Sequence, residues 1–161
     1  MMSSGLKRTL LLRAISSLKV PLLFTCSPRI EKLDELSSVA VIPLRFMTKN
    51  HVGSMYFGAL AMGAELSVAM PIVFDIFQDK KPLTFLFTEF HCEFLKKAKE
   101  DIYFVFDEMP AMNKLKAEVL EKGGAQSGYF SGAAYLKSNY ATKKDPVIKF
   151  RIGVNLKNTK K

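Results

Sequence analysis

The sequence has few of the residues that build metal centres and disulfide scaffolds. Its 161 residues include two cysteines, two histidines and no tryptophan. Two cysteines cannot form a disulfide framework. Two cysteines and two histidines are also too few to favour a Cys/His zinc site. We therefore predict no metal site.

Several motifs of catalysis and cofactor binding are missing as well. The chain has no Gly-x-Ser-x-Gly nucleophile elbow and no glycine-rich phosphate loop of the Walker or dinucleotide type. His91 and Cys92 are neighbours on a predicted strand, so their side chains should point to opposite faces and cannot pair. Cys26 and His51 could still pair, but no motif supports such a pair. The sequence therefore favours neither Cys–His catalysis nor a nucleotide cofactor.

Acidic residues are absent from the first 30 positions, where five basic residues give a charge of +5. Residues 31–136 carry 11 basic and 14 acidic residues, and residues 137–161 carry eight basic residues and one acid. The body is thus mildly acidic and both ends are basic, including a short basic tail at 157–161. A basic end can bind nucleic acid, an anionic membrane or a phosphorylated ligand.

Residues 1–24 predict a basic amphipathic helix that Pro21 stops. Leu6, Leu10, Ile15 and Leu18 recur at helical spacing among serines and basic residues. The same pattern is typical of a mitochondrial transit peptide over residues 1–20. We favour a retained helix and a cytoplasmic protein, with mitochondrial import as the alternative.

The segment from Ser54 to Phe77 is unusually apolar, because Glu65 is the only charged residue between Met55 and Phe74. Its length would suffice for a membrane span. Glu65, Pro71 and the strand-rich flanks favour instead a buried central helix, with Ser54 as its N-cap.

The remaining elements predict an α+β fold with a mostly antiparallel sheet, since no strand–helix–strand unit repeats. The strand at Leu83–Leu95 should pair antiparallel with the next strand, at Asp101–Phe106. Strands are expected at Arg29–Leu33, Ser37–Leu44, Leu83–Leu95, Asp101–Phe106, Gln126–Tyr140 and Val147–Leu156, and a helix at Ala111–Lys122.

Two features of the central helix suggest chemistry. A carboxylate at Glu65 in apolar surroundings would have a raised pKa and could act as a base near neutral pH. The helix start after Asn50 and Gly53 offers free backbone N–H groups and the positive end of the helix dipole, which can stabilise an oxyanion near Gly58.

The stretch NHVGSMYFGALAMGAE, residues 50–65, resembles the signature of hotdog-fold acyl-CoA thioesterases, in particular the phenylacetyl-CoA type. Asn50, Gly53, Gly58 and Glu65 match the Asn, the two Gly positions and the acid of that signature. The stretch also resembles an uncharacterised thioesterase-like group with Asn-His-x-Gly-Thr-Met-Tyr at this place.

The resemblance has two departures at the helix start. Tyr56 stands where the phenylacetyl type has His, and Phe57 where it has a first Gly.

The resemblance implies a hotdog fold over residues 25–156, in which an antiparallel sheet wraps a long central helix behind an extra N-terminal helix. It implies a homodimer or a tetramer. Gly58 and Glu65 should lie ~10 Å apart along one helix. One chain therefore cannot place both at one thioester carbon, and we expect a site shared between subunits.

The implied activity is hydrolysis of an acyl-CoA or an acyl-carrier thioester, with coenzyme A as part of the substrate and no separate cofactor. Glu65 would be the base or nucleophile, and the Gly58 N–H, with Asn50, would polarise the carbonyl. Substrate contacts are expected from Gly53, Tyr56 and Phe57, and phosphate contacts from Lys143, Lys144, Lys149 or Arg151.

The alternative is a non-catalytic hotdog protein that binds acyl-CoA or fatty acid. Its phenylalanines, 13 in all, would line an apolar tunnel. Its basic N-terminal helix would then lie on an anionic membrane. We do not expect nucleic acid as a partner, because the basic ends lack an aromatic-interleaved recognition motif.

Overall fold

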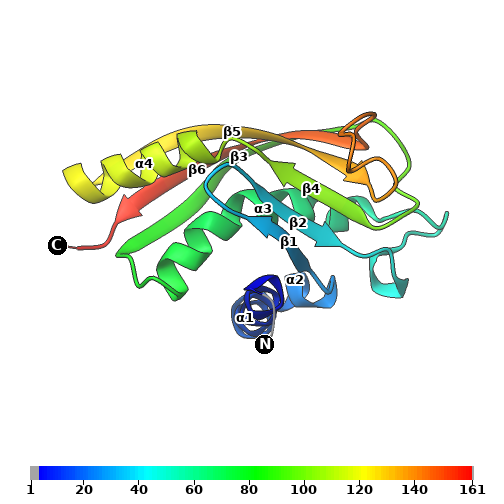
Figure 1. The fold of residues 1–161 in the computed structure, drawn as a ribbon, viewed down its shortest axis with the longest axis horizontal. Helices are drawn as coiled ribbons and strands as arrows, with labels where there is room; N and C mark the ends of the chain where they lie inside the picture. The colour runs from blue at the N-terminus through cyan, green and yellow to red at the C-terminus, as the bar shows by residue number, and fades with distance from the viewer. Residues whose placement is uncertain (1–3, 161) are drawn as a thin grey trace.

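A six-stranded antiparallel sheet curves around one long helix in the computed structural model, which describes residues 4–160 (Figure 1). The strands are β1 (Arg29–Leu33), β2 (Ser38–Ile42), β3 (Leu83–Phe94), β4 (Ile102–Phe106), β5 (Ala125–Leu136) and β6 (Ile148–Asn158). The helices are α1 (Ser4–Lys19), α2 (Pro21–Thr25), the 3-10 turn η1 (Phe46–Thr48), α3 (Phe57–Phe77) and α4 (Met109–Lys122). The predicted α+β class and antiparallel sheet are confirmed.

The sheet order is β1-β2-β4-β5-β6-β3, so the predicted pairing of Leu83–Leu95 with Asp101–Phe106 is wrong. β3 pairs instead with β6 along its whole length, from Leu83 opposite Asn158 to Phe94 opposite Ile148. The segment 95–101 does not form a hairpin because it crosses the end of the sheet. There the Leu95 N–H donates to the Val147 carbonyl at 2.8 Å. This leaves β3 as a long edge strand.

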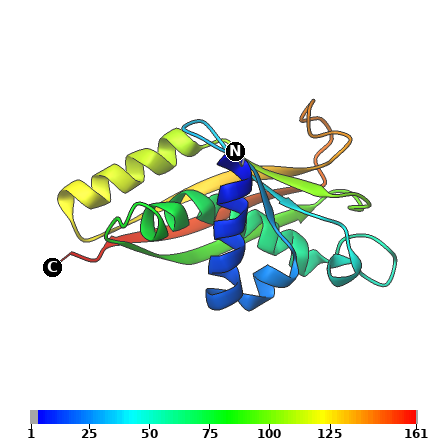
Figure 2. The ribbon, with the colours of Figure 1, turned by 60° about the horizontal axis from the view of Figure 1, so that its bottom comes forward.

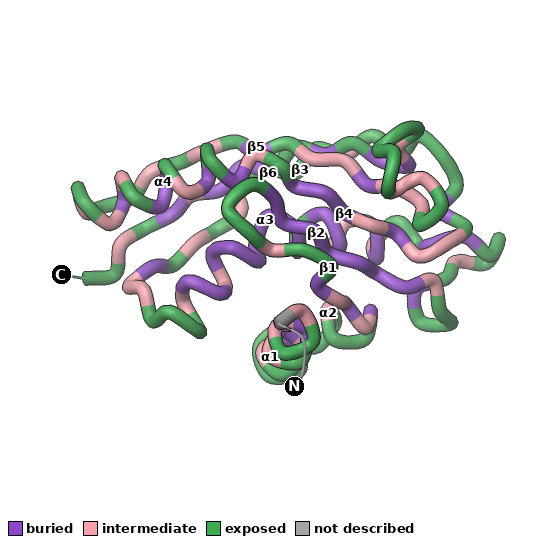
Figure 3. The backbone as a smooth tube through the Cα atoms, in the orientation of Figure 1, coloured by how far each residue is buried: buried purple, intermediate pink, exposed green. Residues whose placement is uncertain are grey.

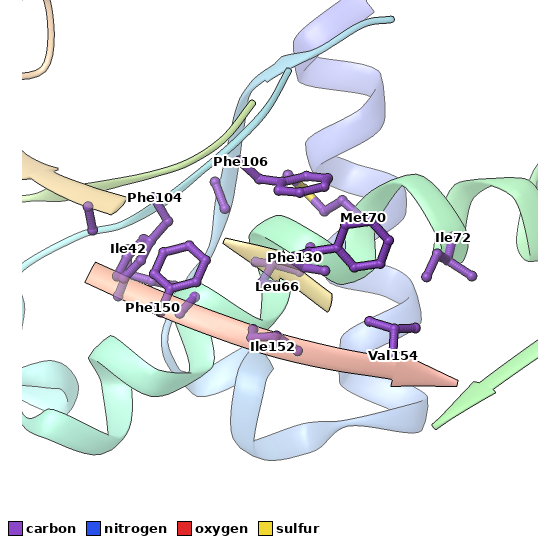
Figure 4. Packing of buried hydrophobic residues seen from close by; sticks show 14 of the residues in the cluster. Ile42, Leu66, Met70, Ile72, Phe104, Phe106, Phe130, Phe150, Ile152 and Val154 are labelled. Atoms are coloured by element: carbon purple, nitrogen blue, oxygen red, sulfur yellow. The ribbon is translucent and has the colours of Figure 1, made fainter. Parts of the chain in front are cut away.

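α3 is the core helix of the fold. It is long and apolar enough to cross a membrane, but 67% of its most apolar window is buried inside the protein. Figure 4 shows Leu66 and Met70 of α3 among Phe130 and Ile152 of the strands. A sheet that covers an apolar helix in this way removes it from water, which is the largest favourable term in folding. The prediction of a buried central helix is confirmed.

The predicted N-cap of this helix is wrong. α3 begins at Phe57 with Tyr56 at the N-cap position, and no side chain caps it. The Ser54 hydroxyl accepts a hydrogen bond from the Asn50 amide nitrogen at 3.0 Å instead. Ser54 therefore belongs to the preceding turn, which competes for its hydroxyl.

α1 packs against β1 and belongs to the fold (Figure 2). Leu12 and Ser16 of α1 are buried, and the Thr9 hydroxyl accepts the Ile30 N–H at 3.0 Å. The predicted N-terminal helix is confirmed, and Pro21 does end it. Pro21 also occupies the first turn of α2, a short helix that the sequence reading did not predict.

One glycine sets how closely α3 approaches the sheet. A Cβ at Gly63 would lie 2.2 Å from the ring of Phe104, which is fully buried on β4. The ring of a core phenylalanine cannot move aside in a close-packed interior. The missing side chain at Gly63 is therefore what allows helix and sheet to meet here.

We expect Gly63→Ala to destabilise the protein by about 1–3 kcal/mol, the usual range for overpacking, despite the helix propensity of alanine. Gly58→Ala is the matched control on the same helix, because its Cβ would meet only the exposed ring of Tyr56. It should leave the free energy of unfolding unchanged or raise it by up to about 1 kcal/mol. Denaturant unfolding measures both, and equal stability of the two variants would contradict the close-packing argument.

Candidate active site

A tight turn of the chain comes directly before the start of α3. The Asn50 side-chain oxygen accepts the N–H groups of Val52 and Ser54, each at 3.1 Å. Gly53 has a φ of +76°, which a residue with a side chain rarely adopts. The side chain of Asn50 is thus occupied by its own loop, and this geometry makes it a residue that positions the helix start.

The first turn of α3 presents backbone N–H groups. Those of Ala59 and Leu60 both donate to the Tyr56 carbonyl, at 3.0 and 3.1 Å. Those of Phe57 and Gly58 have no acceptor among residues 4–160. No acidic side chain lies in this turn, so the positive end of the helix dipole is not neutralised. The helix start can therefore receive a negative charge.

Aromatic side chains surround the helix start. The Tyr56 and Phe57 rings are 4.7 Å apart between centroids, and Phe94 of β3 meets Phe57 edge-on at 6.4 Å. The Tyr56 ring lies over Gly58. The three aromatic residues, with Lys96 and Lys97, line a hollow of about 580 Å³. The hollow combines apolar walls with positive charge at one rim.

Glu65 lies two turns further along α3, on its exposed side. Its carboxylate has no hydrogen bond or ion pair within the described chain. It borders a hollow of about 260 Å³ whose other lining side chains are all apolar: Ala61, Met62, Phe87, Phe90 and Ile152. This apolar contact removes water from part of the carboxyl group and raises its pKa, although one side stays open to solvent. The sequence-based expectation of a carboxylate in apolar surroundings thus fits the geometry.

Within one protomer, Gly58 and Glu65 do not reach one cavity. Glu65 borders the smaller hollow, and the helix start borders the larger one. Both hollows are also lined by residues of β3, the edge strand, so both lie on the side of α3 where the sheet ends.

The predicted phosphate-binding residues divide between two places, neither of them beside Glu65. Lys149 and Arg151 lie on the outer face of β6, where Arg151 stacks over the Tyr129 ring at 4.3 Å. Their neighbours on the strand, Phe150 and Ile152, face the core. Lys143 and Lys144 lie in the loop between β5 and β6.

The structure adds site residues that the sequence reading missed. Phe90 and Phe94 of β3 face the two hollows, and Lys96 and Lys97 follow that strand at the rim. The even spacing of Phe90 and Phe94 within Leu83–Leu95 was the available signal, because it places both on one face of a strand. A register shift between Phe87 and Glu89 brings Phe87 to the hollow that Phe90 lines. His91 lies on the outer face, and burial raises the pKa of the Cys92 thiol to about 11, which leaves no activated thiol here.

Comparison with known proteins identifies the family. The family model described as a domain of unknown function (DUF4442) matches residues 8–126. The chain belongs to this family. The match includes most of α1, the helix start and Glu65. No curated protein matches the chain in sequence.

Solved structures share the fold along nearly the full chain. A protein of unknown function from Chlorobaculum tepidum has a TM-score of 0.77 at 16% identity, over 96% of each chain. A Pseudomonas aeruginosa protein described as a probable thioesterase has a TM-score of 0.71 at 22% identity, over 93% of this chain and 95% of its own. A thioesterase from Haemophilus influenzae has a TM-score of 0.65 at 11% identity, over 93% and 90%. The hotdog fold predicted from residues 50–65 is confirmed.

The Glu65 carboxyl should titrate above its ordinary pKa of 4.5. A carboxyl whose pKa is higher in the folded than in the unfolded chain binds more protons when folded. The free energy of unfolding should therefore fall as the pH rises from 4.5 through the folded pKa. Glu65→Gln should remove this part of the fall, whereas Glu121→Gln on the exposed side of α4 should keep it. Carbon NMR of the carboxyl gives the pKa directly, and titration at or below 4.5 would contradict the apolar setting.

Proposed function

We propose that the protein hydrolyses an acyl thioester, with Glu65 as the base. The observation that carries this proposal is an unpaired carboxylate in an apolar hollow, on the same side of α3 as an uncapped helix start. A base with a raised pKa and a set of oriented N–H donors are the two parts that acyl transfer to water requires. The fold supports the proposal, because several proteins that share it are described as thioesterases.

The reaction follows from these two parts. Glu65 takes a proton from a water molecule as the water oxygen attacks the thioester carbon. The carbonyl oxygen becomes an oxyanion, which the N–H groups of Phe57 and Gly58 stabilise. The carbon–sulfur bond then breaks, the thiolate leaves with the proton held by Glu65, and the products are a carboxylic acid and a thiol.

A complete site needs two chains. The helix start and Glu65 of one protomer border different hollows, and β3 beside them is an edge strand with unpaired backbone groups. Half-exposed Phe90 and Phe94 face the same gap. Pairing of β3 with β3 of a second copy would cover this surface and bring Glu65 of one chain toward Gly58 of the other. We assign the protein as a homodimer or a dimer of dimers on this basis.

The rim lysines fit the phosphates of coenzyme A. Lys96 and Lys97 line the hollow at the helix start, and the Lys96 ammonium lies 2.9 Å from Asp145 in the loop that carries Lys143 and Lys144. That loop therefore adjoins the rim of the hollow. Lys149 and Arg151 have no place in this proposal, because they lie on the outer face of the sheet.

Glu65→Gln keeps the shape of the side chain and removes the base, so we expect it to lower kcat by about 10²–10⁴-fold, the usual contribution of general base catalysis. Release of free thiol from a panel of acyl-CoA substrates measures the loss. Glu121→Gln, a carboxylate on exposed α4, is the control and should retain wild-type activity. Equal activity of Glu65→Gln and the control would exclude Glu65 from the mechanism.

Light scattering should give a mass at least twice the 18.1 kDa of the chain at micromolar concentration. Phe94→Lys should shift the protein toward the monomer, since a charge on an edge strand opposes pairing. Leu36→Lys, also exposed but in the β1–β2 turn, should leave the mass unchanged. A wild-type monomer would remove the shared site and the mechanism that depends on it.

One observation favours the non-catalytic alternative, an acyl-CoA or fatty-acid-binding protein. The Tyr56 ring lies over Gly58, where a substrate carbonyl would approach the backbone. Tight binding of acyl-CoA without release of thiol would support that function over hydrolysis. Tyr56→Ala separates the two, because it should raise turnover only if the ring restricts a functional oxyanion site.

A further inference from the structure

Exposed apolar side chains gather where α1, α2 and η1 meet, and none of them lines either hollow of the candidate site. We call this set the lower patch: Leu18, Val20, Leu22, Phe24, Phe46 and Met47. Phe46 is 90% exposed and Leu18 81%. The two halves adjoin, because Phe24 of α2 and Met47 of η1 line one hollow of about 300 Å³. In Figure 1, α2 and the loop with η1 both project from the lower side of the molecule.

Basic residues surround the lower patch. Lys19, Arg45 and Lys49 are exposed within or beside it, and Arg13 borders its hollow. The two stretches of chain that build it, residues 4–30 and 37–64, contain no Asp or Glu. An exposed apolar surface with a ring of one charge is complementary to a surface that is apolar inside and carries the opposite charge outside.

We propose that the lower patch binds the surface of an anionic lipid bilayer, with Phe46, Met47 and the α2 side chains inserted among the acyl chains. Apolar insertion combined with basic residues at the headgroup level is how amphipathic segments hold to membranes. Each Lys or Arg near an anionic surface contributes to the attraction. The tube in Figure 3 shows these segments as largely exposed in the protomer.

A second copy of the chain fits the lower patch less well. A two-fold symmetric contact would bring the patch against itself and place Lys19, Arg45 and Lys49 near their own copies. Like charges at close range oppose such a contact, whereas an anionic bilayer attracts them.

The lower patch connects directly to the candidate site. The Thr48 carbonyl at the end of η1 accepts the Tyr56 N–H at 2.8 Å, and Lys49 bridges to Met55. Membrane contact would therefore hold the hollow at the helix start close to the bilayer, where long-chain acyl groups partition. This last consequence rests on the proposed function, whereas membrane binding itself does not.

The test is sedimentation of the full chain with vesicles of phosphatidylcholine, with and without phosphatidylserine. We expect binding to the anionic vesicles that weakens with added salt. The double variant Phe46→Ser, Met47→Ser should weaken it by about tenfold or more. The triple variant Lys19→Gln, Arg45→Gln, Lys49→Gln should weaken it by about fivefold for each charge removed. Leu36→Ser, exposed to a similar degree as Met47 in a turn with acidic neighbours, is the matched control and should bind as wild type.

Denaturant unfolding confirms that each variant folds, and hydrolysis of a soluble short-chain acyl-CoA reports the candidate site separately. Loss of vesicle binding with unchanged hydrolysis supports membrane binding by the lower patch. No binding by the wild type, or equal binding by the patch variants and Leu36→Ser, would overturn the proposal while leaving the proposed function intact. A smaller mass of the patch variants in light scattering would assign the patch to a contact between copies and would also overturn it.

Discussion

The fold depends on burying, away from water, one helix that is apolar on every side. α3 has apolar or small side chains over nearly its whole length, so a sheet on one face alone cannot remove it from water. The sheet curves around it, and the missing side chain at Gly63 allows the helix to approach Phe104 closely. The curvature of the sheet, the missing side chain and the burial of α3 are therefore parts of one solution to the same constraint.

That solution leaves a stripe of α3 uncovered in the protomer. Phe57, Ala61 and Glu65 follow each other at intervals of four residues, which places them on one face of a helix. The other positions along the middle of α3 are mostly buried. Glu65 is the only charged residue in this part of the helix, and it occupies the one stripe where a carboxylate keeps contact with water. A buried unpaired carboxylate would cost several kcal/mol, so this stripe is where the helix can hold a reactive acid without losing the fold.

The elements of the fold could be predicted from periodicity, but their pairing could not. Leu83–Leu95 and Asp101–Phe106 are both good strands, and their nearness in sequence favours a hairpin. The segment between them instead crosses the end of the sheet, held by contacts to Val147 that have no local signal. The helix start shows a similar limit. Ser54 has the chemistry of an N-cap, yet Asn50 takes its hydroxyl into the turn before the helix.

The site shows the same division between local and long-range information. The segment 50–65 alone singled out Glu65 and Gly58, because a lone carboxylate and a helix start are local features. Along Val147–Leu156, Lys149 and Arg151 alternate with Phe150 and Ile152. Because successive side chains of a strand point to opposite faces, this alternation alone places the two basic residues on the face away from the core. Phe90 and Phe94 could be assigned to a strand face, but only the sheet order makes that strand an edge beside α3.

The uncovered stripe and the unpaired edge of β3 are therefore one surface with two requirements. The half-exposed phenylalanines need a cover that excludes water, and the backbone groups of β3 need hydrogen-bond partners. A partner that met both would also remove more water from Glu65, and its pKa would rise further because the charged form loses solvation. Assembly would in this way tune the base as well as complete the site, since the contact that satisfies the edge strand also sets the polarity around the carboxylate.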